Sequence, residues 1–526
     1  MPETGEREMG PLSELDVLAV EDLSTFLRTL APLDAATRSS ALELFASALA
    51  SVPGAERPGL SERLFEIREA LRERLPLTLA SQSEQRGIHV DRIMAVDERS
   101  FYIEGWLHDP EIARLTAVSP EGSRHELLDL LFRHARPDVG ETLSIASDKL
   151  EELPGFIGFF ELDAPSLRMD GWLLEIETQR GVATELELPP VITEQDDVLY
   201  RILNNPYITG PPNDQLMSTH VSPAITRIQE RIGTQPGVKA VTQFGTRPEG
   251  AEVSIVVPLY LQIQHLEVQL AQFANDPELY EVDLTYVLDS PQQEEEALGF
   301  AAELYPIYRV PFRVAVLDRN AGFAGANNTG VGLASGRLAL LLNSDVLPER
   351  PGWLRMMRNF YDSTPKIGAL GPKLLYEDDS IQHAGMYFHQ LAGSSKWVDG
   401  HYFKGMHRSL PAANVARPVP VVSGSCLMID RALYQRLGGL SGEYVQGDYE
   451  DSDLCLKLWQ EGLENWYLPE AELYHLEGQS YADEVRRPAN RYNMWLHNHI
   501  WGDRIAERMK QQEAAEKKAR PSGGTR

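Results

Sequence analysis

Four short apolar runs between residues 250 and 345 constrain the fold more than any other feature of the chain. The runs VSIVVPLY, LTYVLD, FRVAVLD and LALLLNSD are rich in β-branched and aliphatic residues, and stretches with helical periodicity separate them. Buried strands that alternate with helices are typical of a doubly wound, mainly parallel sheet. We therefore predict an α/β domain with a Rossmann-like mixed sheet over residues 248–482.

Polar residues stand at the end of each of these runs. In open α/β sheets, ligands bind beyond the carboxyl ends of the strands. A single acidic residue at a strand end is usually a turn or a helix cap, but four such ends in succession indicate a binding site. The residues at these ends are Pro258, Tyr260, Asp289, Asp318, Asn320, Asn343, Ser344 and Asp345.

The chain before this domain divides into two further regions and a linker. Residues 1–82 carry an apolar stripe at helical spacing, which predicts an N-terminal helical region. Residues 83–195 alternate apolar and acidic side chains with a period of two, which predicts an antiparallel β-sandwich domain. Trp106 and Trp172 fit either core packing or sugar stacking in that domain. Residues 196–247, rich in Pro, Gly and Asn, are predicted to be a linker with one helical piece around Ile225 to Ile232.

The chain after this domain, residues 483–526, has the composition of a helix followed by a disordered tail. Aromatic residues at helical spacing predict that the helix packs back on the α/β domain. The lysines of the tail leave open a peripheral contact with anionic lipid. Homo-oligomerisation is also left open.

Composition narrows the functional class. The 526 residues carry a formal net charge of -29, which disfavours binding to nucleic acid phosphates. Cys426 and Cys455 are the only cysteines, too few for a disulfide framework. No segment has the layout of a secretory signal, and no run reaches the roughly 18 apolar residues of a spanning helix. These features predict a cytoplasmic protein with no transmembrane segment.

Four motifs then point to a family. SIVVPLY, NAGFAGANNTGVGLASGRLALLLNSD, SGSCLMID and YEDSDLCLKLWQEG resemble, in order and in spacing, the motifs of family 2 inverting glycosyltransferases of GT-A fold. The resemblance covers less than half of the chain. It implies an enzyme that moves a sugar from a nucleotide diphosphate donor to a carbohydrate acceptor, in a bacterial cell-surface or extracellular polysaccharide pathway. The acceptor could be a lipid-linked or protein-linked glycan.

The resemblance also implies a donor site. Asp289 would accept hydrogen bonds from the base, for which a carboxylate is chemically suited. Asn343 and Asp345 stand at the two acidic positions of the family's Asp-x-Asp motif, and the sequence departs from that motif at Asn343. Asp345 and His475 would hold Mn²⁺ or Mg²⁺. The implied nucleotide-binding residues are Pro258, Tyr260, Asp289, Asn320, Gly322, Asn327, Asn343 and Ser344.

The acceptor side follows from the remaining motifs. By resemblance, Asp451, with Glu450 as substitute, is the general base that takes the proton of the acceptor hydroxyl. Acidic residues at a helix start also fit a purely capping role. The implied sugar-contacting residues are Ser423, Gly424, Ser425, Gln382, His383 and Trp397, with the stretch 394–408 on the acceptor side.

Several alternatives stay open from the sequence. A UDP-sugar is favoured as donor, and a dTDP-sugar such as dTDP-rhamnose also fits a carboxylate that reads a pyrimidine. A non-catalytic glycan-binding or scaffold protein would share the fold without the chemistry. A nucleotidyltransferase should carry a basic glycine-rich loop after its first strand, and SIVVPLYLQIQ has none. Glycoside hydrolysis would need two carboxylates that flank the bond.

Overall fold

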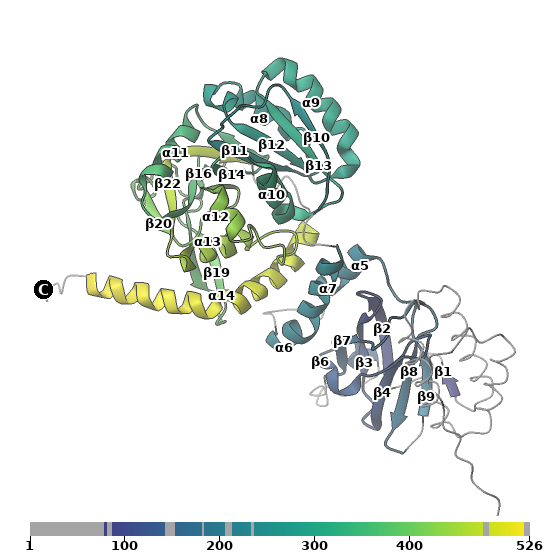
Figure 1. The fold of residues 1–526 in the computed structure, drawn as a ribbon. Helices are drawn as coiled ribbons and strands as arrows, with labels where there is room; N and C mark the ends of the chain where they lie inside the picture. Colours follow the sequence, from purple (N-terminus) through teal and green to yellow (C-terminus); the bar gives the residue numbers. More distant parts are fainter. Residues whose placement is uncertain are drawn as a thin grey trace, which may run out of the picture. The chain divides into compact units, whose positions relative to one another are not determined.

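The structure is a computed structural model that describes residues 78–80, 87–142, 153–180, 183–205, 213–232, 236–476 and 483–519 (Figure 1). Its contacts divide the chain into two compact units, Met1–Arg231 and Ile232–Arg526. Most of the predicted N-terminal helical region lies outside the described residues. Its last part differs from the prediction, because Thr78–Ala80 form a short strand, β1, which pairs with residues 184–186.

Two sheets and one hydrophobic core make up the described part of the first unit. One sheet has the order β2-β3-β7-β6 and the other the order β1-β9-β8-β4-β5. Side chains from both sheets share a core in which Trp172 is 1% exposed and packs against Phe101. The strands are β2 (Ile88–Ala95), β3 (Ser100–Leu107), β4 (Ile112–Val118), β5 (Arg124–Glu126), β6 (Phe132–His134), β7 (Gly155–Glu161), β8 (Leu173–Thr178) and β9 (Ala183–Glu187).

Residues 196–247 contain the helical piece predicted around Ile225 to Ile232, and also regular structure that the linker prediction lacked. Helices α5 (Gln195–Leu203) and α7 (Ser222–Ile232) each bury one apolar face, and β10 (Val238–Phe244) pairs antiparallel with Phe312–Leu317. The many Pro, Gly and Asn residues of this stretch suggested a linker. Burial of the apolar side chains of the two helices stabilises them despite that composition.

The second unit contains a mixed sheet with the order β10-β13-β12-β11-β14-β21-β16-β22-β15. Strands β11 (Val253–Leu259), β12 (Asp283–Leu288), β13 (Phe312–Leu317) and β14 (Leu338–Leu342) run parallel to one another. The next strand, β21 (Cys426–Asp430), is antiparallel to β14, and β16 (Ile367–Leu375) is parallel to β22 (Glu464–His475). The edge strand β15 spans Val346–Pro348. The α/β class predicted from the alternating runs is confirmed.

Helices cover both faces of this sheet (Figure 1). Because strand side chains alternate between faces, Ile255 and Val257 pack under α8 (His265–Phe273), α9 (Glu294–Tyr308) and α11 (Trp353–Ser363). Val256 packs on the other face, which is covered by α10 (Gly322–Leu333), α12 (Arg431–Arg436) and α13 (Glu450–Gln460). Cys426 and Cys455 are both buried as free thiols.

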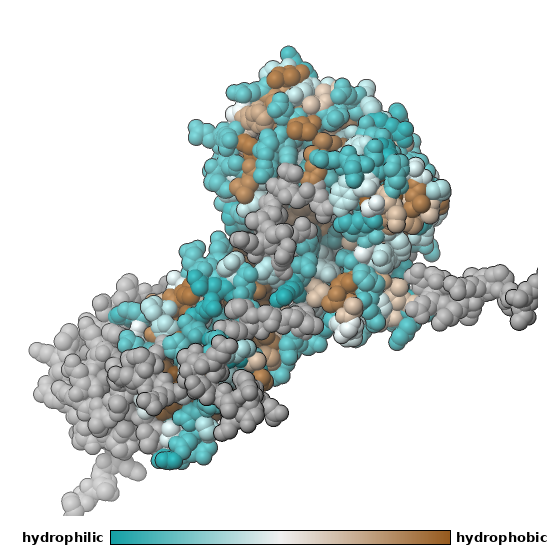
Figure 2. All heavy atoms as spheres, turned by 180° about the vertical axis from the view of Figure 1, so that it is seen from behind, coloured by the Kyte–Doolittle hydropathy of each residue, from teal (hydrophilic) through white to brown (hydrophobic). Residues whose placement is uncertain are grey.

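Two elements extend from this sheet domain. The hairpin of β18 (Met386–Gln390) and β19 (Trp397–His401) forms a separate two-stranded sheet. Helix α14 (Asp483–Ala519) packs Trp501 and Ile505 into the core that contains α13. No helix in the described part of the chain is long and apolar enough to cross a membrane. On the face drawn in Figure 2, hydrophilic side chains predominate and hydrophobic ones form small separate groups.

Candidate active site

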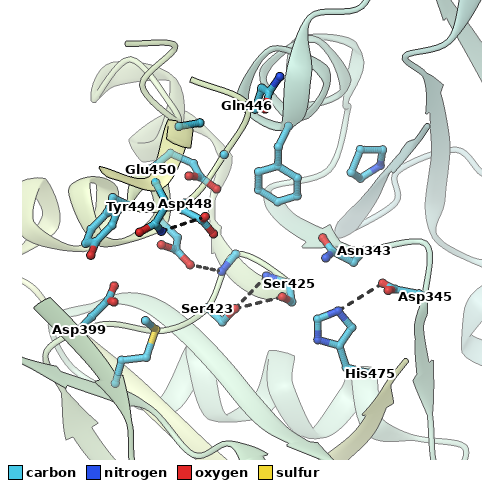
Figure 3. A pocket seen from close by; sticks show the side chains of 18 of the residues that line it. Asn343, Asp345, Asp399, Ser423, Ser425, Gln446, Asp448, Tyr449, Glu450 and His475 are labelled. Carbon is cyan, nitrogen blue, oxygen red and sulfur yellow. Dashed lines mark hydrogen bonds and ion pairs between the residues drawn. The ribbon is translucent and has the colours of Figure 1, made fainter. Parts of the chain in front are cut away.

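A pocket of about 340 Å³ lies in the second unit, beyond the carboxyl ends of β11, β12 and β14 (Figure 3). Strand polarity explains its place, because parallel strands all end at the same edge of their sheet. The sequence-predicted residues that line it are Pro258, Tyr260, Asp289, Asn343, Ser344, Asp345, Gln382, Ser423, Gly424, Ser425, Glu450, Asp451 and His475. The fold thus brings residues almost 220 positions apart into one cavity.

The remaining nucleotide-binding candidates do not line the pocket. The Asn320 side chain accepts a hydrogen bond from the Gly322 N–H at 2.9 Å, which places both residues at the start of α10. Asn327 is fully buried, and its Nδ2 donates to the Phe323 carbonyl within the same helix. The Asn320 Oδ1 and the Asn327 Nδ2 are thus used in local structure, and the Asn327 Oδ1 is buried with no hydrogen-bond partner among the described residues.

His383 and Trp397 also lie away from the pocket wall. His383 is buried, its Nδ1 lies 3.1 Å from the Nδ1 of His401, and burial holds the pKa of His383 well below its usual range. The backbone N–H of Trp397 donates to the Asn498 Oδ1 at 2.6 Å, and the Trp397 indole packs against the core. The partner of His383, His401, is the ring that reaches the pocket.

Asp289 follows β12 at the base of the pocket. Its Oδ1 accepts a hydrogen bond of 2.6 Å from the Ala321 N–H. Burial raises the pKa of Asp289 to about 7, although the N–H groups of Ala321 and Gly322 act in the opposite direction. The carboxyl group is therefore close to the midpoint of its titration at neutral pH.

Asp345 and His475 face each other across the pocket floor (Figure 3). The His475 Nε2 lies 3.3 Å from the Asp345 Oδ1, and the His475 Nδ1 contacts the Gln382 Oε1 at 2.8 Å. Because Oε1 can only accept, Nδ1 carries a proton. With a second proton on Nε2 the ring pairs with the Asp345 carboxylate, and without it Nε2 presents a lone pair that can bind a cation. Burial raises the pKa of Asp345, but His475 and His265 outweigh that effect and leave it below its usual value.

These donors suit a divalent cation. A cation between Nε2 and Oδ1 would satisfy both atoms, and the contact with Gln382 would fix the ring tautomer. The Oδ1 of neighbouring Asn343 is buried and has no hydrogen-bond partner among the described residues. Within the described ranges, no group of three or more His, Cys, Asp or Glu side chains could hold a metal. Asp345 and His475 would therefore share the ion with oxygen atoms of a bound ligand and with water.

Glu450 and Asp451 begin α13 on the opposite side of the pocket. The Asp451 Oδ2 accepts from the Gly424 N–H at 2.9 Å, and its Oδ1 accepts from the Ser452 N–H at 2.7 Å. Glu450 is 5% exposed, and its Oε2 has no hydrogen-bond partner among the described residues. Burial and the charge of Asp451 raise the pKa of Glu450 well above its usual range.

Two further carboxylates belong to this side of the pocket, Asp399 on β19 and Asp448 before α13. Burial, with the charges of Asp451 and Asp448, raises the pKa of Asp399 to about 7. Figure 3 shows both groups on the side of Glu450, away from Asp345 and His475. The sequence analysis missed them as site residues. Asp399 lies in the stretch predicted to form the acceptor side, whereas Asp448 carried no separate signal.

Residues 248–493 match the profile of the family described as glycosyltransferase like family 2. These residues form a glycosyltransferase family 2-like domain. The domain contains every pocket-lining residue, and α14 continues beyond it. The resemblance stated from the four motifs is confirmed for this part of the chain.

Curated relatives match only parts of this chain. An uncharacterized Sinorhizobium fredii protein, y4gI, is 32% identical over 38% of this chain and 22% of its own length. The O-antigen biosynthesis protein RfbC of Myxococcus xanthus is 29% identical over 31% of this chain and 13% of its own. An N-acetylglucosaminyl-diphospho-decaprenol L-rhamnosyltransferase of Mycobacterium tuberculosis is 29% identical over 25% of this chain and 44% of its own. The chain thus spans less than half the length of each.

Among solved structures, GalNAc-T7 with UDP, GalNAc and Mn²⁺ matches with 17% identity and a TM-score of 0.36. The match covers 46% of this chain and 48% of GalNAc-T7. A likeness of that degree carries no argument about the site.

Proposed function

We propose that the protein is an inverting glycosyltransferase that moves a sugar from a nucleotide diphosphate donor to a glycan acceptor. The observation that carries the proposal is the pocket of the glycosyltransferase family 2-like domain. It holds a carboxylate–imidazole pair on one side and a carboxylate bound by two backbone N–H groups on the other. A transferase needs these two sites, one for the donor diphosphate and one for the acceptor hydroxyl.

Asp451 is the general base in this proposal. Burial raises the pKa of both carboxyl groups, but the N–H groups of Gly424 and Ser452 oppose this at Asp451 and stabilise its charged form. Glu450 Oε2 has no hydrogen-bond partner among the described residues, and Glu450 keeps its proton. A charged Asp451 takes the proton of the acceptor hydroxyl while that oxygen forms a bond to the anomeric carbon. The bond from that carbon to the diphosphate breaks on the opposite face, which inverts the configuration.

Asp345 and His475 act on the donor. They would hold a divalent cation, Mn²⁺ or Mg²⁺, which supplies positive charge to the diphosphate oxygens as the bond to the sugar breaks. Asn343, next to this pair, leaves one amide oxygen for a ribose hydroxyl. Asp289, at the end of β12, would accept the N–H of a pyrimidine base.

The donor class has two candidates. A UDP-sugar is our first choice, because the carboxyl of Asp289 suits the imide of uracil. Thymine carries the same imide, so a dTDP-sugar such as dTDP-rhamnose is the second candidate. The similarity to a rhamnosyltransferase over 136 residues favours it. A cell-surface or extracellular polysaccharide is the proposed product, on the similarity to an O-antigen biosynthesis protein.

The test is a nucleotide titration followed by thermal unfolding. We expect one of UDP, dTDP and GDP to raise the melting temperature in the presence of Mn²⁺, and Asp345→Ala to abolish that shift. Asp318→Ala is the matched control, because Asp318 also follows a strand of the sheet but binds the Gly237 N–H outside the pocket. If no nucleotide shifts the wild-type transition, the protein is a glycan-binding or scaffold protein instead.

A further inference from the structure

The segment that leads into Glu450 has an unusual backbone. Gln446, Gly447, Asp448 and Tyr449 have φ angles of 62°, 125°, 71° and 76°, so four consecutive residues lie at positive φ. Residues other than glycine adopt this conformation only when surrounding contacts stabilise it. All four residues line the pocket. Contacts with neighbouring parts of the chain must therefore stabilise this left-handed backbone conformation.

Asn493 on α14 supplies the contacts that hold this segment. Its side chain is fully buried, and its Oδ1 accepts from the Val445 N–H at 2.9 Å. Its Nδ2 donates to the carbonyls of Val445 at 3.0 Å and Gly447 at 2.5 Å. One amide group thus binds both the backbone N–H and the backbone carbonyl of Val445, and also the carbonyl of Gly447 in the left-handed stretch.

The same helix also binds the acidic side chain of the segment and the helix that follows. Asn490 Nδ2 donates to Asp448 Oδ2 at 3.1 Å. Further along α14, the His497 Nε2 lies 3.0 Å from the Ser452 Oγ, and the Trp501 Nε1 donates to Asp453 Oδ1 at 2.8 Å. The C-terminal helix therefore contacts residues on both sides of the Glu450–Asp451 pair.

We infer that Asn493 is a positioning residue that holds residues 445–448 so that the acceptor hydroxyl meets Asp451 in a reactive geometry. The inference rests on the proposed function and deepens it on the acceptor side. No contact of Asn493 reaches Asp345 or His475 in the described part of the domain. Loss of Asn493 should therefore change acceptor-dependent steps and spare nucleotide binding.

The test compares Asn493→Ala with Asn465→Ala in the full chain. Asn465 is also a buried asparagine, and its Nδ2 donates to the carbonyls of Pro420 and Cys455, outside the pocket. For Asn493→Ala we expect kcat/KM for the acceptor to fall about tenfold or more, because misplaced reactants react slowly. The Kd of the nucleotide with Mn²⁺ should stay within about twofold. The control should keep both values even if its melting temperature falls.

Hydrogen–deuterium exchange gives a readout independent of activity. The Val445 amide, which donates to Asn493, should exchange faster in Asn493→Ala and not in Asn465→Ala. If Asn493→Ala does not fold, Asn490→Ala removes the contact to Asp448 and should also lower kcat/KM while sparing nucleotide binding. Unchanged acceptor kinetics, or equal losses in test and control variants, would overturn the inference. A wild-type protein without any transfer activity would instead overturn the proposed function.

Discussion

Glu450 and Asp451 are neighbours in the chain, yet the fold gives their carboxyl groups different surroundings. Asp451 receives N–H groups from Gly424 and Ser452, and Glu450 Oε2 receives none from the described residues. Two adjacent buried carboxyls rarely carry two charges, because each charge disfavours the other. Burial raises the pKa of both groups, but at Asp451 the N–H groups of Gly424 and Ser452 oppose this effect, so the proton belongs on Glu450 rather than on Asp451.

This difference predicts unequal effects of neutral isosteres. We expect Asp451→Asn to lower kcat by about 10² to 10⁴, because it removes the base while keeping the shape of the side chain. Glu450→Gln should lower kcat by about tenfold or less, since the carboxyl it replaces is already neutral. Steady-state kinetics at saturating donor measures both values. A larger loss in Glu450→Gln would assign the base to Glu450 instead.

Glu104, a buried carboxyl group in the first unit, predicts how the stability of the protein depends on pH. It is 2% exposed on β3, neither carboxylate oxygen has a hydrogen-bond partner among the described residues, and Arg92 lies 3.5 Å away. Burial raises its pKa to about 7 from an ordinary value of 4.5, although Arg92 acts in the opposite direction. A pKa raised by folding means that folding favours the protonated form.

The free energy of unfolding should therefore fall as pH rises from about 4.5 to about 7, by roughly 3 kcal/mol from this group. Glu104→Gln should remove that loss and raise the melting temperature at pH 8 more than at pH 5. Calorimetry of the full chain at both pH values measures the difference. Equal changes at pH 5 and pH 8 would show that Glu104 titrates normally.

At the scale of elements, close contact between α10 and the sheet places the glycine-rich segment over β11. A Cβ atom on Gly330 would lie 2.2 Å from the Val256 Cγ1 and 3.0 Å from the Val287 Cγ2. Neither valine can move far, because both are fully buried. Glycine at this position lets the helix approach strands whose ends carry Pro258 and Asp289.

Two alanine substitutions in α10 should separate the effect of the tight helix–sheet contact on stability from the effect of helix propensity. We expect Gly330→Ala to reduce the free energy of unfolding by about 1–3 kcal/mol, the usual cost of overpacking a core. Gly332→Ala, two residues on, meets nothing within 4 Å and should stabilise the helix by about 0.5–1 kcal/mol. Chemical denaturation of the two variants measures both changes. Similar changes of the same sign would contradict the proposed contact.

At the scale of the whole molecule, charge decides how an anionic donor can bind. The chain has a formal net charge of -29, and the acidic residues Asp399, Asp448 and Asp451 line the pocket together with the basic residue Lys404. Lys404 supplies one positive charge among these carboxyl groups, so a nucleotide diphosphate should bind more tightly when a cation adds further positive charge. The pair Asp345 and His475 is where a cation would supply that charge.

Metal removal should therefore weaken donor binding. We expect EDTA to raise the Kd of the preferred nucleotide by about tenfold or more, and added Mn²⁺ to restore it. His475→Ala should weaken the binding of the nucleotide in the presence of Mn²⁺. The weaker nucleotide binding that remains in EDTA should not change. Isothermal titration with and without EDTA measures this. An equal Kd under both conditions would exclude a metal-dependent donor site.

The sequence by itself determined the class of the sheet domain and the edge where its pocket lies. Alternating buried runs specify parallel strands, and parallel strands end at one edge, so Asp289 and Asp345 were candidates from their positions alone. Position did not separate them from Asp318, which also ends a strand but does not line the pocket. His475 and the Glu450–Asp451 pair were recognisable only by family resemblance, because a lone histidine or an acidic helix start has common structural roles.

Only the tertiary structure decided which polar groups point into the pocket and which are used in local structure. Asn320 and Asn327 stand in the same glycine-rich stretch, but the Asn320 Oδ1 accepts from the first residue of α10 and the Asn327 Nδ2 donates within that helix. Asp399 and Asn493 come from a hairpin and a C-terminal helix whose paths depend on packing between segments far apart in sequence. Local patterns carry no information on such contacts, since side-chain direction there follows from long-range burial and not from periodicity.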